Sequence, residues 1–318
     1  MLIVQKFGGS SLAGAERLRR AASIIADSAD AGNKVVAVVS ARGDMTDELL
    51  GQARRISADP PVRELDALLS CGETGSAAMT AMQLADMGKS CVSLTGAQAG
   101  ILTDSVHGAA RILSIDTARI MRELDAGKIV VAAGFQGAER GGDTTTLGRG
   151  GSDTTAVELA AALKADRCEI YSDVDGIYTA DPRLVTGAVR LDSIDYGDML
   201  HLALHGSQVL HSRSVEAAMR ANVRVHLLSS FTRHEGTVMC KLDDRPGLCG
   251  VTRDSSLGTV SIIGREADAH VLAEAVAALA HSDIIVTRTE LFDGGCSLFV
   301  SPDRLLPALE ITHRRFFR

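Results

Sequence analysis

The feature that most constrains this chain is a stretch of 41 residues in which two polar loops flank an apolar helix and a strand. It reads DTTTLGRGGSDTTAVELAAALKADRCEIYSDVDGIYTADPR from Asp143 to Arg183. Three glycines surround Arg149, and the polar run Ser152–Thr155 follows them. A helix that begins after such a run has unpaired N–H groups, which attract anions. Arg149 can bind a carboxylate or phosphate through two parallel hydrogen bonds.

The second loop follows a short predicted strand from Cys168 to Ser172. Asp173 then lies at the carboxyl end of that strand, where open α/β sheets place their ligands. A glycine-rich turn that merely caps a core helix, with Thr155 and Glu158 at capping-box spacing, is the commoner structure for one such loop. Two polar loops separated by one helix and one strand instead favour a phosphate-handling site.

The N-terminal segment repeats this arrangement. Leu2 to Val4 predicts a strand that delivers Lys6 to its carboxyl end, and Gly8–Ser11 then turns into a helix. The pattern is neither a Walker A loop nor G-x-G-x-x-G. A lysine beside two glycines usually lies on the surface, but the order strand, turn, helix favours a phosphate contact here.

Further apolar runs predict the architecture. Lys34 to Val39 is continuous in apolar residues, as a parallel strand buried on both faces should be. Ser40 and Thr46 are expected in the loop that follows, where helix capping is their alternative role. Strands at 91–94 and 129–133 and a helix from Glu73 to about 87 continue an alternating order, which predicts a mostly parallel sheet between helices.

The C-terminal part has a different pattern. The polar segment 241–248 suggests a domain boundary. Beyond it we expect strands at 250–253, 259–263, 284–289 and 296–300 and helices near 271–280 and 304–316. These elements predict a small α+β module.

Composition excludes several classes of protein. The net charge of −7 argues against nucleic acid as a partner. The six cysteines show no C-x-x-C spacing, so they indicate free thiols in a reducing, cytoplasmic setting. We expect no signal peptide and no membrane span.

Several motifs together resemble the aspartate kinases of the amino acid kinase family. They are KFGGSS, VVSARGDMTDEL, CGETGSA, GFQG, GRGGSDTTA, SDVDGIYTADPR and VLHSRSVEAA, in the family's order between residues 6 and 218. The resemblance implies an amino acid kinase domain over residues 1–243. It also implies a single ferredoxin-like ACT domain over residues 249–318, where members usually carry two.

The implied reaction is the first step of aspartate-family amino acid biosynthesis. ATP, with Mg²⁺ bridging its phosphates, phosphorylates the side-chain carboxylate of L-aspartate to give 4-phospho-L-aspartate. The resemblance implies no metal-ligating side chain. It assigns catalysis to Lys6 and Asp153. The implied aspartate pocket comprises Ser40, Thr46, Glu73, Arg149, Gly150, Gly151 and Ser152. The implied nucleotide site comprises Lys6, Gly8, Gly9, Ser10, Ser172, Asp173, Tyr178, Arg183 and Gln208.

The chain departs from the family at two places. Gln208 stands where members often place a lysine, so either Arg213 or a tightly held Mg²⁺ compensates, which we favour, or the phosphates lack one cation. The loop 265–269 is poor in glycine, and with a single ACT domain this predicts weak or absent inhibition by lysine and threonine. We expect a homodimer or higher homo-oligomer through the ACT region. Two alternatives stay open: a kinase of the same fold for a related acidic metabolite, and a nucleotide-binding regulatory subunit with low turnover.

Overall fold

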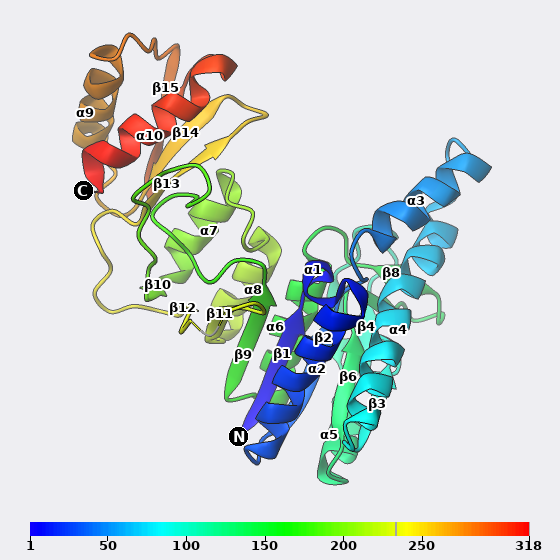
Figure 1. Cartoon of the computed structure of the whole chain (residues 1–318). Coiled ribbons are helices and arrows are strands. Elements are labelled where there is room, and N and C mark those ends of the chain that lie inside the picture. Colours follow the sequence, from blue (N-terminus) through cyan, green and yellow to red (C-terminus); the bar gives the residue numbers. More distant parts are fainter. Residues whose placement is uncertain (233, 318) are drawn as a thin grey trace. The chain divides into compact units, whose positions relative to one another are not determined.

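The computed structural model describes residues 1–232 and 234–317, and the chain forms two compact units (Figure 1). The first unit contains Met1–Asp175 and Arg220–His234, and the second contains Gly176–Met219 and Glu235–Arg318. These limits differ from the predicted domains, because residues 176–219 group with the C-terminal segment. The division into a kinase domain over 1–243 and an ACT domain over 249–318 stays a prediction.

A parallel sheet forms the centre of the first unit. Its strands run in the order β11-β9-β1-β2-β6-β3. The long apolar strands β2 and β6 are buried almost throughout, as predicted for strands covered on both faces. The six strands are β1 Leu2–Phe7, β2 Lys34–Val39, β3 Cys91–Leu94, β6 Ile129–Ala133, β9 Arg167–Ser172 and β11 Val225–Ser229.

Helices pack on both faces of this sheet. The helices α2 and α4 share one hydrophobic core with alternate residues of β2 and β6, including Val39 and Val131. The helices α5 and α6 lie behind the sheet in the view of Figure 1. The helices of this unit are α1 Gly9–Leu12, α2 Gly14–Asp30, α3 Met45–Ile56, α4 Val62–Asp86, α5 Ala118–Asp125 and α6 Gly151–Leu163.

Two predictions about these helices were wrong. Glu73 does not begin a helix, because α4 begins at Val62 and places Glu73 near its middle. Thr46 does not lie in a loop but in the first turn of α3, after Asp44 at the N-cap.

A second, smaller sheet in the first unit was not predicted. Its strands run in the order β5-β4-β7-β8, and β8 packs against α4. Strands of three or four residues are too short to show a period of two, so their pattern in the sequence is weak. They are β4 Ile101–Thr103, β5 Ile112–Ile115, β7 Gln136–Ala138 and β8 Thr144–Thr146.

The second unit contains the predicted α+β module. Its antiparallel sheet runs in the order β13-β14-β16-β15. From β14 to α10 the elements follow the first five of the ferredoxin-like order β-α-β-β-α-β, and β13 pairs beside β14. The module comprises β13 Gly250–Asp254, β14 Thr259–Ile263, α9 Ala269–Ala280, β15 Arg288–Phe292, β16 Gly295–Phe299, the short 3₁₀ helix Pro302–Arg304 and α10 Leu305–Phe316.

The predicted fold class, a mostly parallel α/β sheet with a small C-terminal α+β module, is therefore confirmed. The limits of one predicted strand were wrong. The strand expected at 284–289 lies at 288–292 instead. Ile284 belongs to the connection before this strand, and it is apolar because it is buried in the module's core. The rest of the second unit carries β10 Ser193–Ile194, α7 Tyr196–Leu204, most of α8 Ser212–Ala221 and β12 Thr237–Met239, with β10 and β12 paired in parallel. Over the described residues, no helix combines the length and apolar character needed to cross a membrane.

Candidate active site

Polar loops converge at the carboxyl edge of the parallel sheet because backbone pairing continues past the strand ends. The N–H of Gly8 donates to Tyr171 O (3.2 Å), and that of Ser40 donates to Phe7 O (3.1 Å). On the other side of β2, the N–H of Gly134 donates to the carbonyl of Val39, the last residue of β2 (3.0 Å). The strand order reverses at β1, between β9 and β2. Open α/β sheets bind ligands in the crevice outside such a reversal.

An ion pair occupies this edge. Lys6 is the last residue but one of β1, and Asp153 lies in the first turn of α6. Lys6 Nζ lies 2.6 Å from Asp153 Oδ1, and their side chains are only 11% and 14% exposed. A Cβ added to Gly8 would lie 3.5 Å from Lys6 Nζ, so the ammonium group lies against the glycine turn. The two predicted catalytic residues are therefore in direct contact.

Glycine is required where the neighbouring turns meet. A Cβ at Gly9 would lie 2.6 Å from Ala41 O, a separation that no side chain tolerates. Gly43 N–H donates to Gly9 O (3.0 Å), which fastens the turn after β1 to the loop after β2. Ser10, in α1, is half-buried beside this contact. The glycine turn after β1 and the loop that carries Ser40 are therefore held in direct contact.

The predicted glycine-rich loop leads into α6 as expected, but its cap differs. Gly150 is the N-cap in the left-handed region (φ 70°), and the helix begins at Gly151. Thr155 therefore lies inside the helix, where its hydroxyl donates to Gly151 O (2.8 Å) and accepts from Phe135 N–H (3.1 Å). Thr155 and Glu158 have capping-box spacing in the sequence, but they form no capping box in the structure.

Phe135 is a residue that the sequence did not single out. It has a positive φ of 67°, which costs a residue with a side chain about 1–3 kcal/mol. Thr155 accepts from its N–H, and its carbonyl accepts from Leu147 N–H (2.8 Å). The adjacent Gly134 lies so near Ser152 that an added Cβ would be 2.9 Å from Ser152 Oγ. The strained residue thus fixes the loop after β6 against the start of α6.

Glu73 is a buried carboxylate with one free oxygen. It is 3% exposed, and Oε1 accepts from Ala41 N–H (3.0 Å). Its other oxygen, Oε2, has no hydrogen-bond partner among the described residues. Burial raises the pKa of Glu73 to about 7, although the Ala41 hydrogen bond opposes the shift. A buried carboxylate oxygen without a partner is costly, so the site is suited to a cation supplied by a ligand.

Three other predicted pocket residues have less defined contacts. Ser40 and Thr46 are half-buried, and Ser40 precedes the residue that bonds Glu73. Arg149 is exposed and has no bond to any residue that the structure describes. The guanidinium group of Arg149 is therefore available to a ligand.

The predicted nucleotide residues divide between the two units. Ser172 ends β9, and its Oγ accepts from Val174 N–H (3.3 Å), while the neighbouring Asp173 is exposed. The other three belong to the second unit: Tyr178, Arg183 and Gln208. Their role in nucleotide binding stays a prediction.

Within the second unit, Arg183 is held by a neighbouring carboxylate and Gln208 is exposed. Arg183 forms a two-point contact with Asp181, with Nε to Oδ1 at 3.0 Å and Nη2 to Oδ2 at 2.9 Å. Gln208 is exposed in the connection between α7 and α8.

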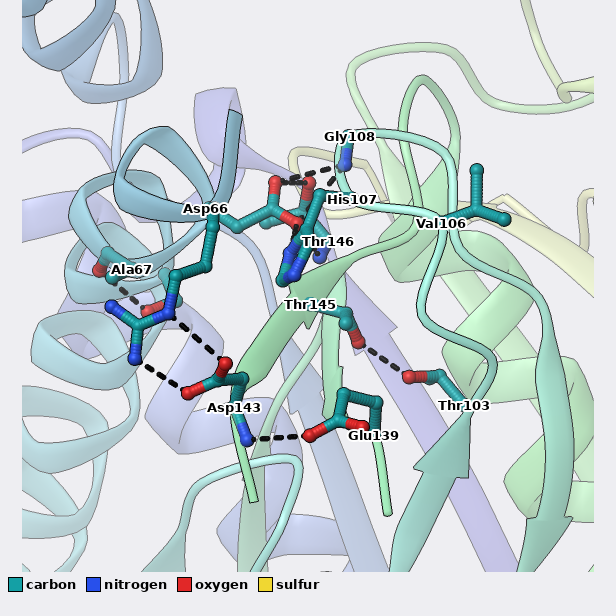
Figure 2. Close-up of polar contacts among 12 residues, drawn as sticks. Asp66, Ala67, Thr103, Val106, His107, Gly108, Glu139, Asp143, Thr145 and Thr146 are labelled. Atoms are coloured by element: carbon teal, nitrogen blue, oxygen red, sulfur yellow. Dashed lines mark hydrogen bonds and ion pairs between the residues drawn. The ribbon is translucent and has the colours of Figure 1, made fainter. Parts of the chain in front are cut away.

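A second buried carboxylate braces the loop that carries Arg149. Figure 2 shows Asp66, on α4, surrounded by donors from two other segments. It is 1% exposed and accepts from Gly108 N–H (3.0 Å), from Thr146 N–H (3.0 Å) and from Thr146 Oγ1 (2.5 Å). Its Oδ2 also lies 2.9 Å from His107 Nδ1. Because Thr146 ends β8 just before the glycine-rich loop, Asp66 ties that loop to the helix of Glu73.

Known proteins have sequences similar to this chain over most of its length. The profile of the amino acid kinase family matches residues 1–229. An aspartokinase of Mycolicibacterium smegmatis is 48% identical over 89% of this chain and 69% of its own length. An aspartokinase of Geobacillus stearothermophilus is 47% identical over 90% of this chain and 71% of its own length. The chain belongs to the aspartokinases of the amino acid kinase family.

Solved structures of aspartokinases are also similar to this chain. An E. coli aspartokinase III in complex with aspartate and ADP superposes with a TM-score of 0.72, at 26% identity, over 98% of this chain and 84% of its own. The aspartate kinase of Synechocystis gives a TM-score of 0.69 at 36% identity, over 99% of this chain and 55% of its own. A UMP kinase of Bacillus anthracis shares the fold alone, with a TM-score of 0.55 at 21% identity over 76% of this chain and 96% of its own.

The Asp66 contacts predict a stability difference between two variants of α4. Asp66→Asn should lower the free energy of unfolding by about 2–4 kcal/mol, because an amide nitrogen would face buried N–H donors. Arg63→Gln is the matched control, since Arg63 bonds Asp143 on the same hairpin from the helix surface. Exposed ion pairs contribute little, so Arg63→Gln should change little. Thermal unfolding measures both, and equal losses would contradict the bracing role of Asp66.

Glu73 predicts a pH-dependent stability difference. Because its folded pKa of about 7 exceeds the ordinary value of 4.5, the contribution of Glu73 to stability is largest below pH 4.5 and is lost as pH rises through 7. The full loss corresponds to at most about 3 kcal/mol. Glu73→Gln keeps the Ala41 bond and removes this loss, so its thermal midpoint should exceed that of wild type by more at pH 8 than at pH 5. The same gap at both pH values would show that Glu73 is not the titrating group.

Proposed function

We propose that this chain transfers the γ-phosphoryl group of ATP to the side-chain carboxylate of L-aspartate, giving ADP and 4-phospho-L-aspartate. The observation that carries this proposal is the Lys6 ammonium group, which Asp153 holds against Gly8 where the strand order reverses. The relatives named aspartokinase support the choice of acceptor.

The chemistry fits a site without a general base. A carboxylate oxygen of aspartate attacks the γ-phosphorus, and the bond from that phosphorus to the bridging oxygen of ADP breaks. The acceptor is already ionised near neutral pH, since the ordinary pKa of such a group is about 4. Catalysis then consists of positioning and charge neutralisation, which a buried lysine supplies. Asp153 keeps the Lys6 ammonium in place between reactions.

The amino acid pocket combines opposite charges. Glu73 Oε2 accepts from the substrate's ammonium group, and Arg149 binds its α-carboxylate at two points. Ser40 and Thr46 line the pocket, and the start of α6 at Gly150, Gly151 and Ser152 contributes N–H donors.

The nucleotide site takes its residues from four segments. Gly8, Gly9 and Ser10 contact the phosphates together with Lys6, and the remaining contacts come from Ser172, Asp173, Tyr178, Arg183 and Gln208.

Mg²⁺ enters as part of the nucleotide substrate. The described residues contain no group of three or more His, Cys, Asp or Glu side chains arranged for a metal ion, and Asp153 is engaged by Lys6. Phosphate oxygens and water commonly complete the coordination of Mg²⁺ in such sites. The ion neutralises phosphate charge.

We further propose that the enzyme is a cytoplasmic homodimer or higher homo-oligomer with a kinase domain over 1–243 and an ACT domain over 249–318. The strand β15 supports the contact between copies, because it lies at the edge of its sheet with Leu291 51% exposed.

An acceptor assay tests the reaction. We expect ADP release with Mg²⁺, ATP and L-aspartate, and hydroxylamine should trap the acyl phosphate as a hydroxamate. Succinate, which is aspartate without its ammonium group, is the matched control and should react poorly. Faster turnover of another carboxylic acid would favour the related-metabolite alternative. Nucleotide binding without turnover of any acid would favour the regulatory subunit.

Single variants test the ion pair. Lys6→Met and Asp153→Asn should each lower kcat about a hundredfold or more, as expected when one stabilising charge is lost from a buried site. Lys34→Met is the control, because Lys34 is an exposed lysine at the opposite end of the neighbouring strand. Turnover like that of wild type in Lys6→Met would rule out the assignment.

A further inference from the structure

The loop that follows β9 is part of the C-terminal module rather than a free connection. Ala180 and Val185 are 4% and 3% exposed, and they belong to the same hydrophobic core as Val260, Ile262 and Leu298 of the module's sheet. The turn from Asp181 to Val185 is closed by a hydrogen bond from Val185 N–H to Asp181 O (2.9 Å). The segment that carries Tyr178 and Arg183 therefore packs as one more layer of that module.

Thr179, between Tyr178 and the buried Ala180, makes the polar contacts of this layer. Its N–H donates to Val189 O (2.9 Å), and its carbonyl accepts from Val251 N–H of β13 (2.7 Å). Its hydroxyl accepts from Val189 N–H (3.0 Å) and lies 2.9 Å from His313 Nε2. The backbone and the side chain of Thr179 are thus both fastened to the module.

His313 lies in the last turns of α10, and it is 3% exposed. Burial lowers the pKa of His313, so its imidazole is neutral near pH 7 and pairs with the hydroxyl as an uncharged group. The ring of Phe317 stacks on it with centroids 5.3 Å apart. Packing on one side and a hydrogen bond on the other hold the imidazole in a single orientation.

We propose that His313 is a positioning residue for the nucleotide: through Thr179 it fixes Tyr178 and Arg183, so that the C-terminal module sets the affinity for ATP. This inference rests on the proposed function, which assigns Tyr178 and Arg183 to the nucleotide. Arg183 depends on the same anchorage, because Asp181, its two-point partner, begins the turn that ends at the buried Val185.

Two variants remove the contact from either side. His313→Leu and Thr179→Val should each weaken ADP binding and raise the KM for ATP roughly three- to tenfold, the effect of one hydrogen bond. The KM for aspartate should stay as in wild type. His313→Gln, which can still bond the hydroxyl, should recover most of the affinity. The double variant should be little worse than either single one, because both remove the same interaction.

Thr312→Val is the matched control. Thr312 is buried next to His313 on α10, and its hydroxyl has no partner among the described residues. This variant should bind ADP like wild type. If it weakens ADP binding as much as His313→Leu does, general disturbance of α10 explains the effect and the proposal is overturned.

Calorimetric titration with ADP separates this proposal from the proposed function, because it needs no turnover. If Arg183→Gln weakens ADP binding but His313→Leu and Thr179→Val do not, the positioning role is wrong and the nucleotide assignment stands. If Arg183→Gln leaves ADP binding unchanged, the nucleotide assignment itself fails. A fall in thermal midpoint for Thr179→Val with unchanged ADP affinity would reduce the contact to a structural one.

Discussion

The site depends on how closely four backbone segments approach at the carboxyl edge of the sheet. A Cβ at Gly9 would overlap Ala41 O, and a Cβ at Gly134 would overlap Ser152. Hydrogen bonds that continue the strand pairing hold these segments in register. Because backbone contacts fix the loops, the polar side chains between them are not needed to hold the loops together and are available for binding and catalysis. Substituting Gly9 would separate the segment that carries Lys6 from the Ser40 loop, and substituting Gly134 would separate the loop after β6 from the start of α6.

The two buried charged groups at the carboxyl edge of the sheet, Lys6 and Glu73, have opposite kinds of surroundings. Lys6 is paired with Asp153, so its ammonium group stays oriented and tolerable in a largely buried place. Glu73 is buried with one oxygen unpaired, and its raised pKa reflects that cost. A ligand with a cationic group would provide a partner for the unpaired oxygen of Glu73. A ligand with a phosphate group would bind the ammonium group of Lys6. Kinases with other acceptors share the fold, so we propose that these side chains, and not the sheet, select aspartate.

Long buried elements could be predicted from the sequence, and elements set by distant contacts could not. The run Val35–Val39 is apolar throughout, and the predicted strand Lys34–Val39 has the limits that the structure shows. The helix predicted to begin at Glu73 instead begins at Val62, and Gly72 lies inside it, where an added Cβ would be 2.9 Å from Ala41 Cβ. The left-handed Phe135 and the donors around Asp66 come from residues far apart in the sequence, so no local pattern reveals them. Lys6 and Asp153 were identified through motifs, and the structure adds that they touch.

We propose that Lys6 faces the transferring phosphoryl group while Glu73 holds the amino acid. A crystal structure of the protein with ADP and L-aspartate tests it most directly. We expect Lys6 Nζ within hydrogen-bonding distance of a phosphate oxygen, and the aspartate ammonium group about 3 Å from Glu73 Oε2, with the side-chain carboxylate directed toward the phosphates. An aspartate bound with its ammonium group away from Glu73, or a nucleotide whose phosphates do not approach Lys6, would contradict it.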